Sequence, residues 1–346
     1  MTEKRHFISE GATVREALQA LNALSGESMT LFALDGDGRL SGTVTDGDIR
    51  RALISGSGLG DTLRGVMHRG FLAATPGDNL SHAIAEGRRR GISLLPVLSD
   101  GFVVEVLDLR TLRTSLPIDA VLMAGGRGER LRPLTENTPK PLLPVGGKAI
   151  IDYNVDELEA CGVENIFVTV NYLADQIEDH FCHRQGRSSV TCVREPRRLG
   201  TMGSLSLVEG LSRDNVLMMN SDLLTTIDFE AFYNHHSRCG ADLTMASVPY
   251  NVSVPFALMR LEKDRVTGLV EKPTYNYFAN AGVYLMKREL LGRLAKGEYM
   301  DAPDFISALI ADGGHVGCYP IEGTWIDIGS PNDYKYANEL MNRRML

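Results

Sequence analysis

Several features of secreted, membrane-bound or nucleic-acid-binding proteins are missing from this 346-residue sequence. It contains five cysteines, an odd number, and no C-x-x-C pair, which argues against a disulfide framework or a zinc ribbon. No run approaches the ~18 apolar residues of a membrane span, and residues 1–7 are too polar for a secretory signal. Positive charge is scarce, because 36 Lys and Arg stand against 44 Asp and Glu, a formal net charge of −8. We therefore expect a cytoplasmic protein with reduced thiols that binds neither nucleic acid nor a membrane, although a local basic site can still exist.

The composition is that of a folded protein. Hydrophobic residues make up 43% and charged residues 23%, which excludes global disorder. At roughly 150 residues per domain the length predicts two domains. Glycine is abundant, with 35 residues, which indicates many positions of positive φ or close approach to a ligand.

The first third of the chain contains an internal repeat. Residues 10–14 recur as 76–80, and in each copy apolar residues then follow at helical spacing. An apolar strand comes next, at 31–34 or 94–98, followed by an Asp-Gly turn and a second strand that closes on Asp48-Ile49-Arg50 in the first copy. A unit of ~60 residues with one helix and two strands cannot bury its own apolar face, so the two copies should pair. This pattern predicts an α+β domain.

The end of this second strand carries a recognisable motif. Gly42-Thr43-Val44-Thr45-Asp46-Gly47-Asp48 resembles the ribose-binding stretch G-x-x-T-x-x-D of cystathionine-β-synthase (CBS) modules. The resemblance implies that Gly42, Thr45 and Asp48 form a regulatory site in which the hydroxyl and the carboxylate hold the ribose of an adenosine nucleotide. The second copy keeps Asp108 but lacks the glycine and threonine at this spacing. The alternative is a packing domain that binds no ligand.

A polar, proline-ended segment at 113–117 marks a boundary, which predicts a tandem CBS domain at 1–115 and a second domain at 116–346. Beyond the boundary, strands and helices alternate, so we expect an α/β domain with a Rossmann-like, mainly parallel sheet. The predicted strands are 118–123, 166–170, 216–220, 243–248, 256–261, 266–271 and 282–286, and the predicted helices are 150–161 and 174–181. In such sheets ligands bind beyond the carboxyl ends of strands, here after Met123 and Asn220. His235-His236 is expected at a solvated helix end.

A glycine-rich segment follows the first of these strands. Gly125-Gly126-Arg127-Gly128-Glu129-Arg130 places three glycines in four positions, which lets backbone N–H groups approach an anion, and its arginines add charge. The spacing matches neither a Walker A loop nor the dinucleotide-binding G-x-G-x-x-G. Within ten residues of the glycine-rich stretch comes Pro139-Lys140-Pro141, whose prolines fix the backbone around one lysine. This arrangement suits the presentation of a point charge to a phosphate.

Together these two segments resemble the signature of the sugar-1-phosphate nucleotidyltransferases, and the resemblance extends over about 118–346. Further motifs follow in the family's order, and the resemblance implies a role for each. The implied nucleotide-binding residues are Gly125, Gly126, Gly128, Gly200 and Thr201; the implied magnesium ligands are Asp222 and Asp327; the implied sugar-binding residues are Glu271, Asn280 and Gly282; and the implied catalytic residues are Arg130, Lys140, Asp222, Lys272 and Asp327.

Two positions depart from the family's pattern. Ser221 stands where relatives usually have the glycine before the first metal-binding aspartate. Val254-Pro255-Phe256-Ala257 stands where relatives usually have Pro-Tyr-Gly, and the methyl group of Ala257 would narrow access to the sugar. The identity of the sugar therefore stays open.

The resemblance implies an enzyme that transfers a nucleoside monophosphate from an NTP to a sugar 1-phosphate with Mg²⁺, and releases pyrophosphate. The product would be an NDP-sugar for surface-glycan or glycoconjugate synthesis. GTP is the favoured donor, with UTP, CTP and dTTP as alternatives, and a homo-oligomer is expected, with nucleotide regulation through the CBS pair. The alternative from another class is a nucleotide-sensing regulatory protein with an inactive transferase domain. The intact Arg130, Lys140, Asp222, Lys272 and Asp327 argue against it.

Overall fold

A computed structural model describes residues 4–24, 27–76 and 80–343, so the repeat residues Gly77, Asp78 and Asn79 lie outside the described residues. The chain divides into two compact units, Met1–Ser115 and Leu116–Leu346. Within the described ranges, no helix is both long enough and apolar enough to cross a membrane.

The first unit repeats a helix followed by a two-stranded hairpin. Its elements are β1 (Phe7–Ser9), α1 (Val14–Ala23), β2 (Thr30–Leu34), β3 (Leu40–Thr45), α2 (Asp46–Ile54), α3 (Leu80–Arg89), β4 (Leu94–Ser99) and β5 (Phe102–Asp108). Strand β2 pairs in parallel with β1 and antiparallel with β3, while β4 and β5 form the second hairpin. Phe32 and Leu40 of the first half pack with Leu94 of the second, so the two repeats share a core as their apolar faces require.

The predicted second strand of the first repeat ends earlier than expected. It stops at Thr45, and Asp48 lies in the first turn of α2 rather than on a strand. Thr45 is the N-cap of this helix: the Thr45 hydroxyl accepts from the Asp48 N–H, and the Asp48 carboxylate accepts from the Thr45 N–H at 2.8 Å. This capping box starts a helix where the apolar pattern alone predicts a strand.

The second unit is built around a seven-stranded sheet. Its strands, in spatial order, are β10 (Ser189–Arg194), β9 (Asn165–Val170), β6 (Ile118–Met123), β11 (Asn215–Asn220), β16 (Thr274–Lys287), β13 (Leu243–Ser253) and β17 (Val316–Pro320). Only β16 runs antiparallel to its neighbours in this sheet. The carboxyl ends of β6, β11 and β13 therefore meet at the same edge, which is where ligands bind in open α/β sheets.

Helices and short strand pairs complete this unit. The helices are α4 (Ile150–Ala160), α5 (Ala174–Cys182), α6 (Gly200–Gly203), α7 (Phe229–Cys239), α8 (Ala302–Ala311) and α9 (Pro331–Asn342), with 3₁₀ turns that include η3 (Glu129–Leu131) and η4 (Lys140–Leu142). The short pairs are β7 (Pro144–Val145) with β8 (Lys148–Ala149), β12 (Leu223–Thr225) with β18 (Trp325–Asp327), and β14 (Leu258–Glu262) with β15 (Arg265–Val270).

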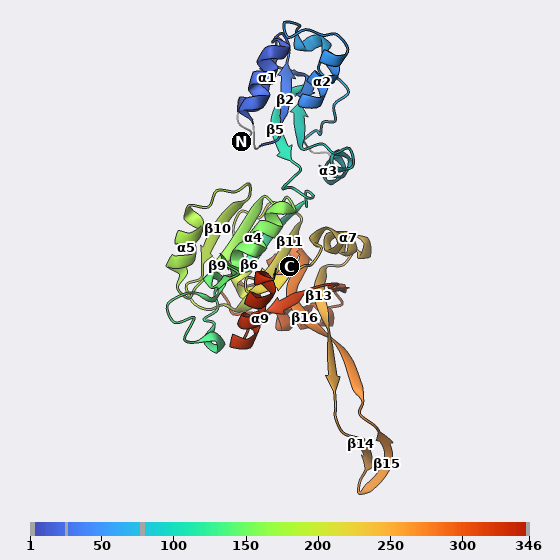
Figure 1. Cartoon of the computed structure of the whole chain (residues 1–346). Coiled ribbons are helices and arrows are strands. Elements are labelled where there is room, and N and C mark those ends of the chain that lie inside the picture. The colour runs from blue at the N-terminus through green and yellow to red at the C-terminus, as the bar shows by residue number, and fades with distance from the viewer. Residues whose placement is uncertain (1–3, 25–26, 77–79, 344–346) are drawn as a thin grey trace. The chain divides into compact units, whose positions relative to one another are not determined.

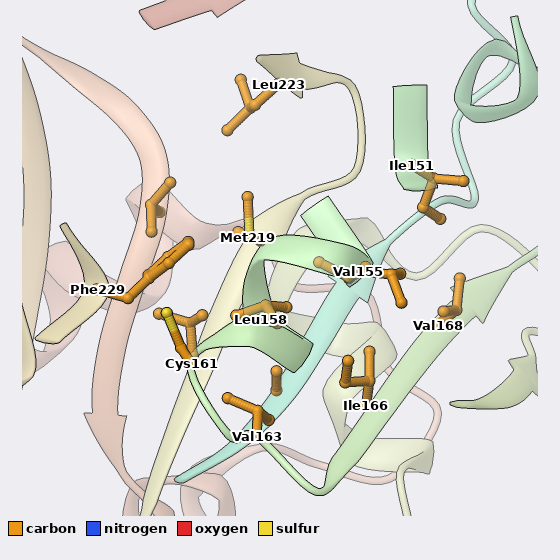
Figure 2. Packing of buried hydrophobic residues seen from close by; sticks show 14 of the residues in the cluster. Ile151, Val155, Leu158, Cys161, Val163, Ile166, Val168, Met219, Leu223 and Phe229 are labelled. Carbon is orange, nitrogen blue, oxygen red and sulfur yellow. The ribbon is translucent and has the colours of Figure 1, made fainter. Parts of the chain in front are cut away.

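The sheet buries both of its faces. Leu122 of β6 packs in one cluster with Val155 and Leu158 of α4. Figure 2 shows Val155 and Leu158 in this cluster, together with Ile166 and Val168 of β9. The neighbouring Val121 points to the opposite face and packs with Phe305 of α8. Burial on both sides explains why these parallel strands are apolar throughout rather than alternating.

Strands β13 and β16 continue far beyond the sheet. The sequence predicts 243–248 and 282–286, whereas the paired strands reach Ser253 and begin at Thr274. We call residues 248–279 the arm; the arm ends in the β14–β15 hairpin and projects away from the sheet (Figure 1). The aromatic and β-branched residues of the arm favour strands. Because these residues lie outside the core, the pattern of buried apolar residues does not show how far β13 and β16 extend.

One histidine departs from the expectation of a solvated helix end. His236 of α7 is only 3% exposed, and its Nδ1 lies 2.7 Å from the Thr244 hydroxyl. Its Nε2 lies 3.2 Å from the Asn215 side-chain oxygen. Phe229 and Phe232 precede it by seven and four residues, so helical periodicity places all three on the face that packs against the sheet.

This burial predicts a pH-dependent stability. Burial lowers the pKa of His236 from 6.5 to about 4. Between these pH values the imidazole binds a proton in the unfolded chain but not in the folded chain. The contribution of neutral His236 to stability is therefore fully present above pH 6.5 and is lost as the pH falls toward 4. Melting temperatures of wild type and His236→Gln, measured from pH 7.5 to 4.5, should show a smaller acid loss in the variant. Equal losses would contradict the assignment.

Candidate active site

A buried lysine lies between two aspartates at the carboxyl edge of the sheet. The Lys140 Nζ donates a hydrogen bond to Asp222 and lies 3.7 Å from the Asp327 Oδ1. Pro139 and Pro141 flank the lysine in η4, and only 10% of its side chain is exposed. Asp222 directly precedes β12, and Asp327 ends β18 opposite Leu223 in this antiparallel pair. The short β12–β18 pair thus brings together two carboxylates that are 105 positions apart in the sequence.

The electrostatics of this cluster favour a bound cation. Burial, and then the neighbouring charge of Asp222, raise the pKa of Asp327, while Lys140 and Arg130 act in the opposite direction. The Asp222 Oδ1 is buried and has no hydrogen-bond partner among the described residues. An orphaned carboxylate oxygen beside a second carboxylate fits a hard divalent cation, which binds oxygen ligands.

The cluster does not make a complete protein cage for a metal. Among the described residues, no group of three or more His, Cys, Asp or Glu side chains is placed to hold a metal ion. Mg²⁺ is usually held by one or two carboxylates, with water and substrate phosphates filling its other positions. The donor set of two aspartates therefore fits Mg²⁺ bound together with a phosphorylated substrate.

The arginine of the glycine-rich segment belongs to the same site. Arg130 lies in η3, and a Cβ on Gly329 would stand only 3.0 Å from its Nη2, so its guanidinium packs on the backbone just after Asp327. Gly128 has a φ of +60°, and a Cβ there would lie 3.1 Å from the Lys140 Cβ. Gly128 therefore allows the glycine-rich segment to turn back against Lys140. Gly128 is not among the residues that line the cleft beside Gly125 and Gly126.

A cleft of about 190 Å³ opens beside this cluster. Its lining includes the predicted Gly125, Gly126, Gly200 and Thr201, together with Asp222. The structure thus brings four of the five predicted nucleotide-binding residues to one cleft that borders the Lys140 cluster.

Two acidic residues of this cleft were not predicted. Glu195 is buried after β10, its Oε2 accepts from the Leu199 N–H at 3.1 Å, and burial raises its pKa. Asp301 accepts from the Thr201 N–H at 3.2 Å and stands at the N-cap of α8. Glu195 could have been found from the alternating strand before it, and Asp301 from the Asp-Ala-Pro sequence that starts a helix.

The predicted sugar-binding residues are divided between two places. Gly282 of β16 lies at the edge of the sheet, where a Cβ would stand 2.5 Å from the Asn220 side-chain nitrogen. Asn280 is nearby, and its Nδ2 donates to the Tyr284 hydroxyl at 2.7 Å. Glu271 and Lys272, in contrast, are exposed on the arm, so within this chain they do not join the Lys140 cluster.

The first unit has a separate and larger cleft. Its volume is about 650 Å³, and its lining includes Thr45, Asp48 and Arg51. The Thr45 hydroxyl donates to Asp48 at 2.6 Å, and Arg51 donates to the same carboxylate at 2.6 Å. Gly42 is not part of the lining, because it packs on Met67, whose Sδ would stand 2.8 Å from a Cβ at this position. Of the two clefts, the smaller one borders the buried Lys140 and its carboxylates. The larger volume of the cleft in the first unit therefore does not identify it as the active site.

The fold is a mixed α/β fold with a central, mostly parallel sheet and a second, smaller α+β unit at the N-terminus. The chain belongs to the nucleotidyl transferase family, which matches residues 119–344, and residues 1–55 match the CBS domain. The family assignment and the mixed α/β fold class expected from the sequence are both confirmed.

Named relatives fall in the same family. A mannose-1-phosphate guanylyltransferase of Mycobacterium tuberculosis is 31% identical over 226 residues, which are 63% of this chain and 62% of that protein. The bifunctional protein GlmU of Methanococcus vannielii is 28% identical over 243 residues, 66% of this chain and 56% of that one. This chain therefore spans about three-fifths of the length of these curated relatives.

Solved structures show the same fold. The crystal structure of HddC from Yersinia pseudotuberculosis aligns with a TM-score of 0.52 and 25% identity, over 64% of this chain and 98% of that one. A second structure of HddC, complexed with GMP-PN, aligns with a TM-score of 0.51.

The geometry around Gly200 predicts a substitution effect. Gly200 has a φ of +77°, and a Cβ would stand 2.6 Å from the Met300 carbonyl oxygen, which accepts from Met202 and Gly203. Gly200→Ala should therefore lower the free energy of unfolding by about 1–3 kcal/mol more than positive φ alone would. Gly210→Ala is the matched control, because Gly210 has a φ of +91° and its nearest neighbour lies 3.9 Å from the added Cβ. Equal losses in denaturant titrations would contradict this reading.

Proposed function

We propose that the Leu116–Leu346 unit transfers a nucleoside monophosphate from an NTP to a sugar 1-phosphate and releases pyrophosphate. The observation that carries this proposal is the buried Lys140, held between Asp222 and Asp327 beside the glycine-lined cleft. One cation and two carboxylates at that position suit a reaction that brings polyanions together with a divalent metal.

The reaction would be an in-line displacement at the α-phosphorus. A phosphate oxygen of the sugar 1-phosphate forms the new P–O bond, and the bond to the β-phosphate oxygen breaks as pyrophosphate leaves. The attacking oxygen is already an anion, so no general base is required. The barrier comes from repulsion between negative groups, and catalysis should rest on positioning and on charge neutralisation.

Each positive group has a place in this scheme. Arg130 and the backbone of Gly125 and Gly126 would bind the β- and γ-phosphates. Lys140 would contact the α-phosphate and the incoming phosphate. We also propose that Lys272 holds the sugar phosphate.

The remaining polar residues would bind the metal and the sugar. Asp222 and Asp327 would hold Mg²⁺, which when bound supplies Lewis-acid neutralisation of the phosphate oxygens. We propose that Glu271, Asn280 and Gly282 contact the sugar.

The relatives support GTP as the donor. The curated relative from Mycobacterium tuberculosis is named a mannose-1-phosphate guanylyltransferase, and the HddC structure is described with GMP-PN. UTP, CTP and dTTP remain the alternatives. The product, an NDP-sugar, would serve surface-glycan or glycoconjugate synthesis.

A substrate panel tests the proposed function. Pyrophosphate release should be measured with Mg²⁺, each of the four triphosphates, and mannose, hexosamine or heptose 1-phosphate. We expect release that requires both substrates and is fastest with GTP. Release with no pair would favour the alternative, a nucleotide-sensing regulatory protein with an inactive transferase domain.

Lys140→Ala and Lys140→Met should reduce kcat by about 10²–10³, because removing one preorganised contact to the transition-state charge typically costs that much. Lys148→Ala is the matched control, since Lys148 pairs with Asp156 and lies outside the cluster. Its kcat should stay near that of wild type. Unchanged turnover in folded Lys140 variants would remove this lysine from the mechanism.

Asp222→Asn and Asp327→Asn should each raise the Mg²⁺ concentration needed for half-maximal activity, because an amide is a poorer ligand for a hard cation. If the two carboxylates share one ion, the double variant should lose much less than the sum of the single losses in free energy. Asp214→Asn serves as the control, since the Asp214 side chain is 97% exposed. Coincident Mg²⁺ curves for wild type and Asp327→Asn would exclude Asp327 as a ligand.

We propose that the cleft of the first unit binds an adenosine ribonucleotide and that this binding controls the transferase. Support comes from the position of Thr45 and Asp48 in the lining of the 650 Å³ cleft. Asp48 already accepts from Arg51 and Thr45, so ribose hydroxyls would add to or replace existing hydrogen bonds. Control also requires that the nucleotide bind the more and less active conformations unequally.

Asp48→Ala should abolish calorimetric binding of AMP, ADP or ATP at this cleft, where we expect at most one nucleotide per chain. Glu16→Ala is a closely matched control, because Thr13 and Glu16 form the same capping box at the start of α1 and do not line the cleft. Both variants lose a helix cap, worth about 1 kcal/mol, but only Asp48→Ala should lose the ligand. Absence of binding to wild type by all three nucleotides would leave the unit a structural or dimerising module.

A further inference from the structure

The arm exposes far more large apolar side chains per residue than the rest of the described chain. Of the 21 large hydrophobic side chains that are exposed within the described residues, 11 lie on the arm. Phe256 and Phe278 are each 71% exposed, and Leu269 is 68% exposed. A concentration of this kind on 32 residues marks an interaction surface rather than the scattered apolar residues of an ordinary protein exterior.

The arm cannot be stable in water by itself. It is a two-stranded ribbon, and in the described chain neither β14 nor β15 pairs with a third strand. Isolated two-stranded hairpins are marginally stable at best, and need further strands or a packed face to persist. The arm therefore requires a surface that covers its apolar side chains.

The arm also cannot reach the site of its own chain. Its ladder is continuous from Ser247↔Asn280 to Ser253↔Thr274, and the Val254 N–H then donates to the Pro273 carbonyl at 3.0 Å. Six residues at ~3.3 Å each place Lys272, beside Pro273, about 20 Å beyond the sheet edge. Folding back would break the hydrogen bonds that hold the ribbon straight.

The site, in turn, lacks a wall. Its cleft of about 190 Å³ is smaller than the roughly 300 Å³ or more of most ligand sites, and 40% of the Asp327 side chain is exposed. Strand β13 runs parallel to β6 and β11, so the arm leaves the sheet at the same edge on which the cleft opens. Each chain thus has an open site, and beside it an uncovered ribbon that carries Glu271 and Lys272.

We propose that two copies of this chain exchange their arms, so that the arm of each copy covers and completes the active site of the other. Lys272 of one copy then faces the Lys140, Asp222 and Asp327 cluster of the second copy. A reciprocal exchange about a twofold axis covers the apolar side chains of both arms and completes both open sites. It also closes the assembly at two copies. The role given to Lys272 rests on the proposed function.

Complementation between two inactive variants tests the exchange. Full-length Lys140→Ala and Lys272→Ala carry different affinity tags, are co-expressed, and are purified as mixed dimers through both tags. Exchange places one intact core beside one intact arm, so the mixed dimer should show half of the wild-type activity. Lys140→Ala with Asp222→Asn is the control pair, and it should stay inactive because both defects lie in the core. Failure of the first pair to rise above its parents would overturn the proposal.

A second measurement does not depend on activity. Wild-type chains with ¹⁴N and ¹⁵N are mixed by co-refolding and treated with a lysine cross-linker. Cross-links from Lys263 or Lys272 of the arm to lysines of residues 116–247 and 280–343 should contain both isotopes in half of the cases. Cross-links within one isotope alone, or none from the arm to this body, would contradict the exchange.

The apolar contacts supply a matched pair of variants. Leu269→Asp should reduce the mixed-isotope cross-links at least severalfold, whereas Ile310→Asp, on α8 and 57% exposed, should leave them unchanged. Equal yields in both variants would show that the arm's apolar surface does not hold the copies together. Mixed cross-links in a wild-type protein that lacks activity would uphold the exchange and reject the proposed function. Activity without mixed cross-links would uphold the proposed function and reject the exchange.

Discussion

The ion pairs of Lys140 with Asp222 and Asp327 are the constraint on which the second unit depends. An ammonium group with 90% of its side chain buried is costly unless carboxylates compensate it. The three residues come from η4, from the turn between β11 and β12, and from β18, so their meeting fixes three distant segments at one edge of the sheet. The positive φ of Gly128 and the β12–β18 pair serve this arrangement, because each allows one of these segments to approach.

The parts of the fold that the sequence predicts are those with buried, continuous apolar segments. Strand β6 matches its predicted range, and β9 and β11 differ from theirs by one residue, because both faces of these strands are covered. Strand β10 was not predicted, because its six residues are all half-buried or exposed and the polar Ser189 and Thr191 interrupt its apolar positions. His236 shows the opposite error: a polar residue was expected in solvent, but helical spacing from Phe229 and hydrogen bonds from two strands place it inside.

The candidate site was predictable where chemistry and loop position coincide. Lys140, Asp222 and Asp327 follow recognisable motifs, and the structure brings them together. The Asp-Ala-Pro sequence indicates Asp301 as the start of a helix, but not as a residue of the cleft, because its distance from Thr201 depends on the packing of α8 against α6. The position of Lys272 could not be predicted either, because local patterns specify the strands but not how far β13 and β16 carry this lysine from the sheet.

In the proposed reaction, charge neutralisation around Lys140 supports one direct displacement at the α-phosphorus. The stereochemistry at that atom tests this claim most directly. The donor would be a single diastereomer of an NTP with sulfur on the α-phosphorus, supplied with a sugar 1-phosphate, and the configuration of the NDP-sugar product would be determined by phosphorus NMR. Direct in-line transfer predicts inversion. Retention would require two displacements through a nucleotidylated residue and would contradict the account.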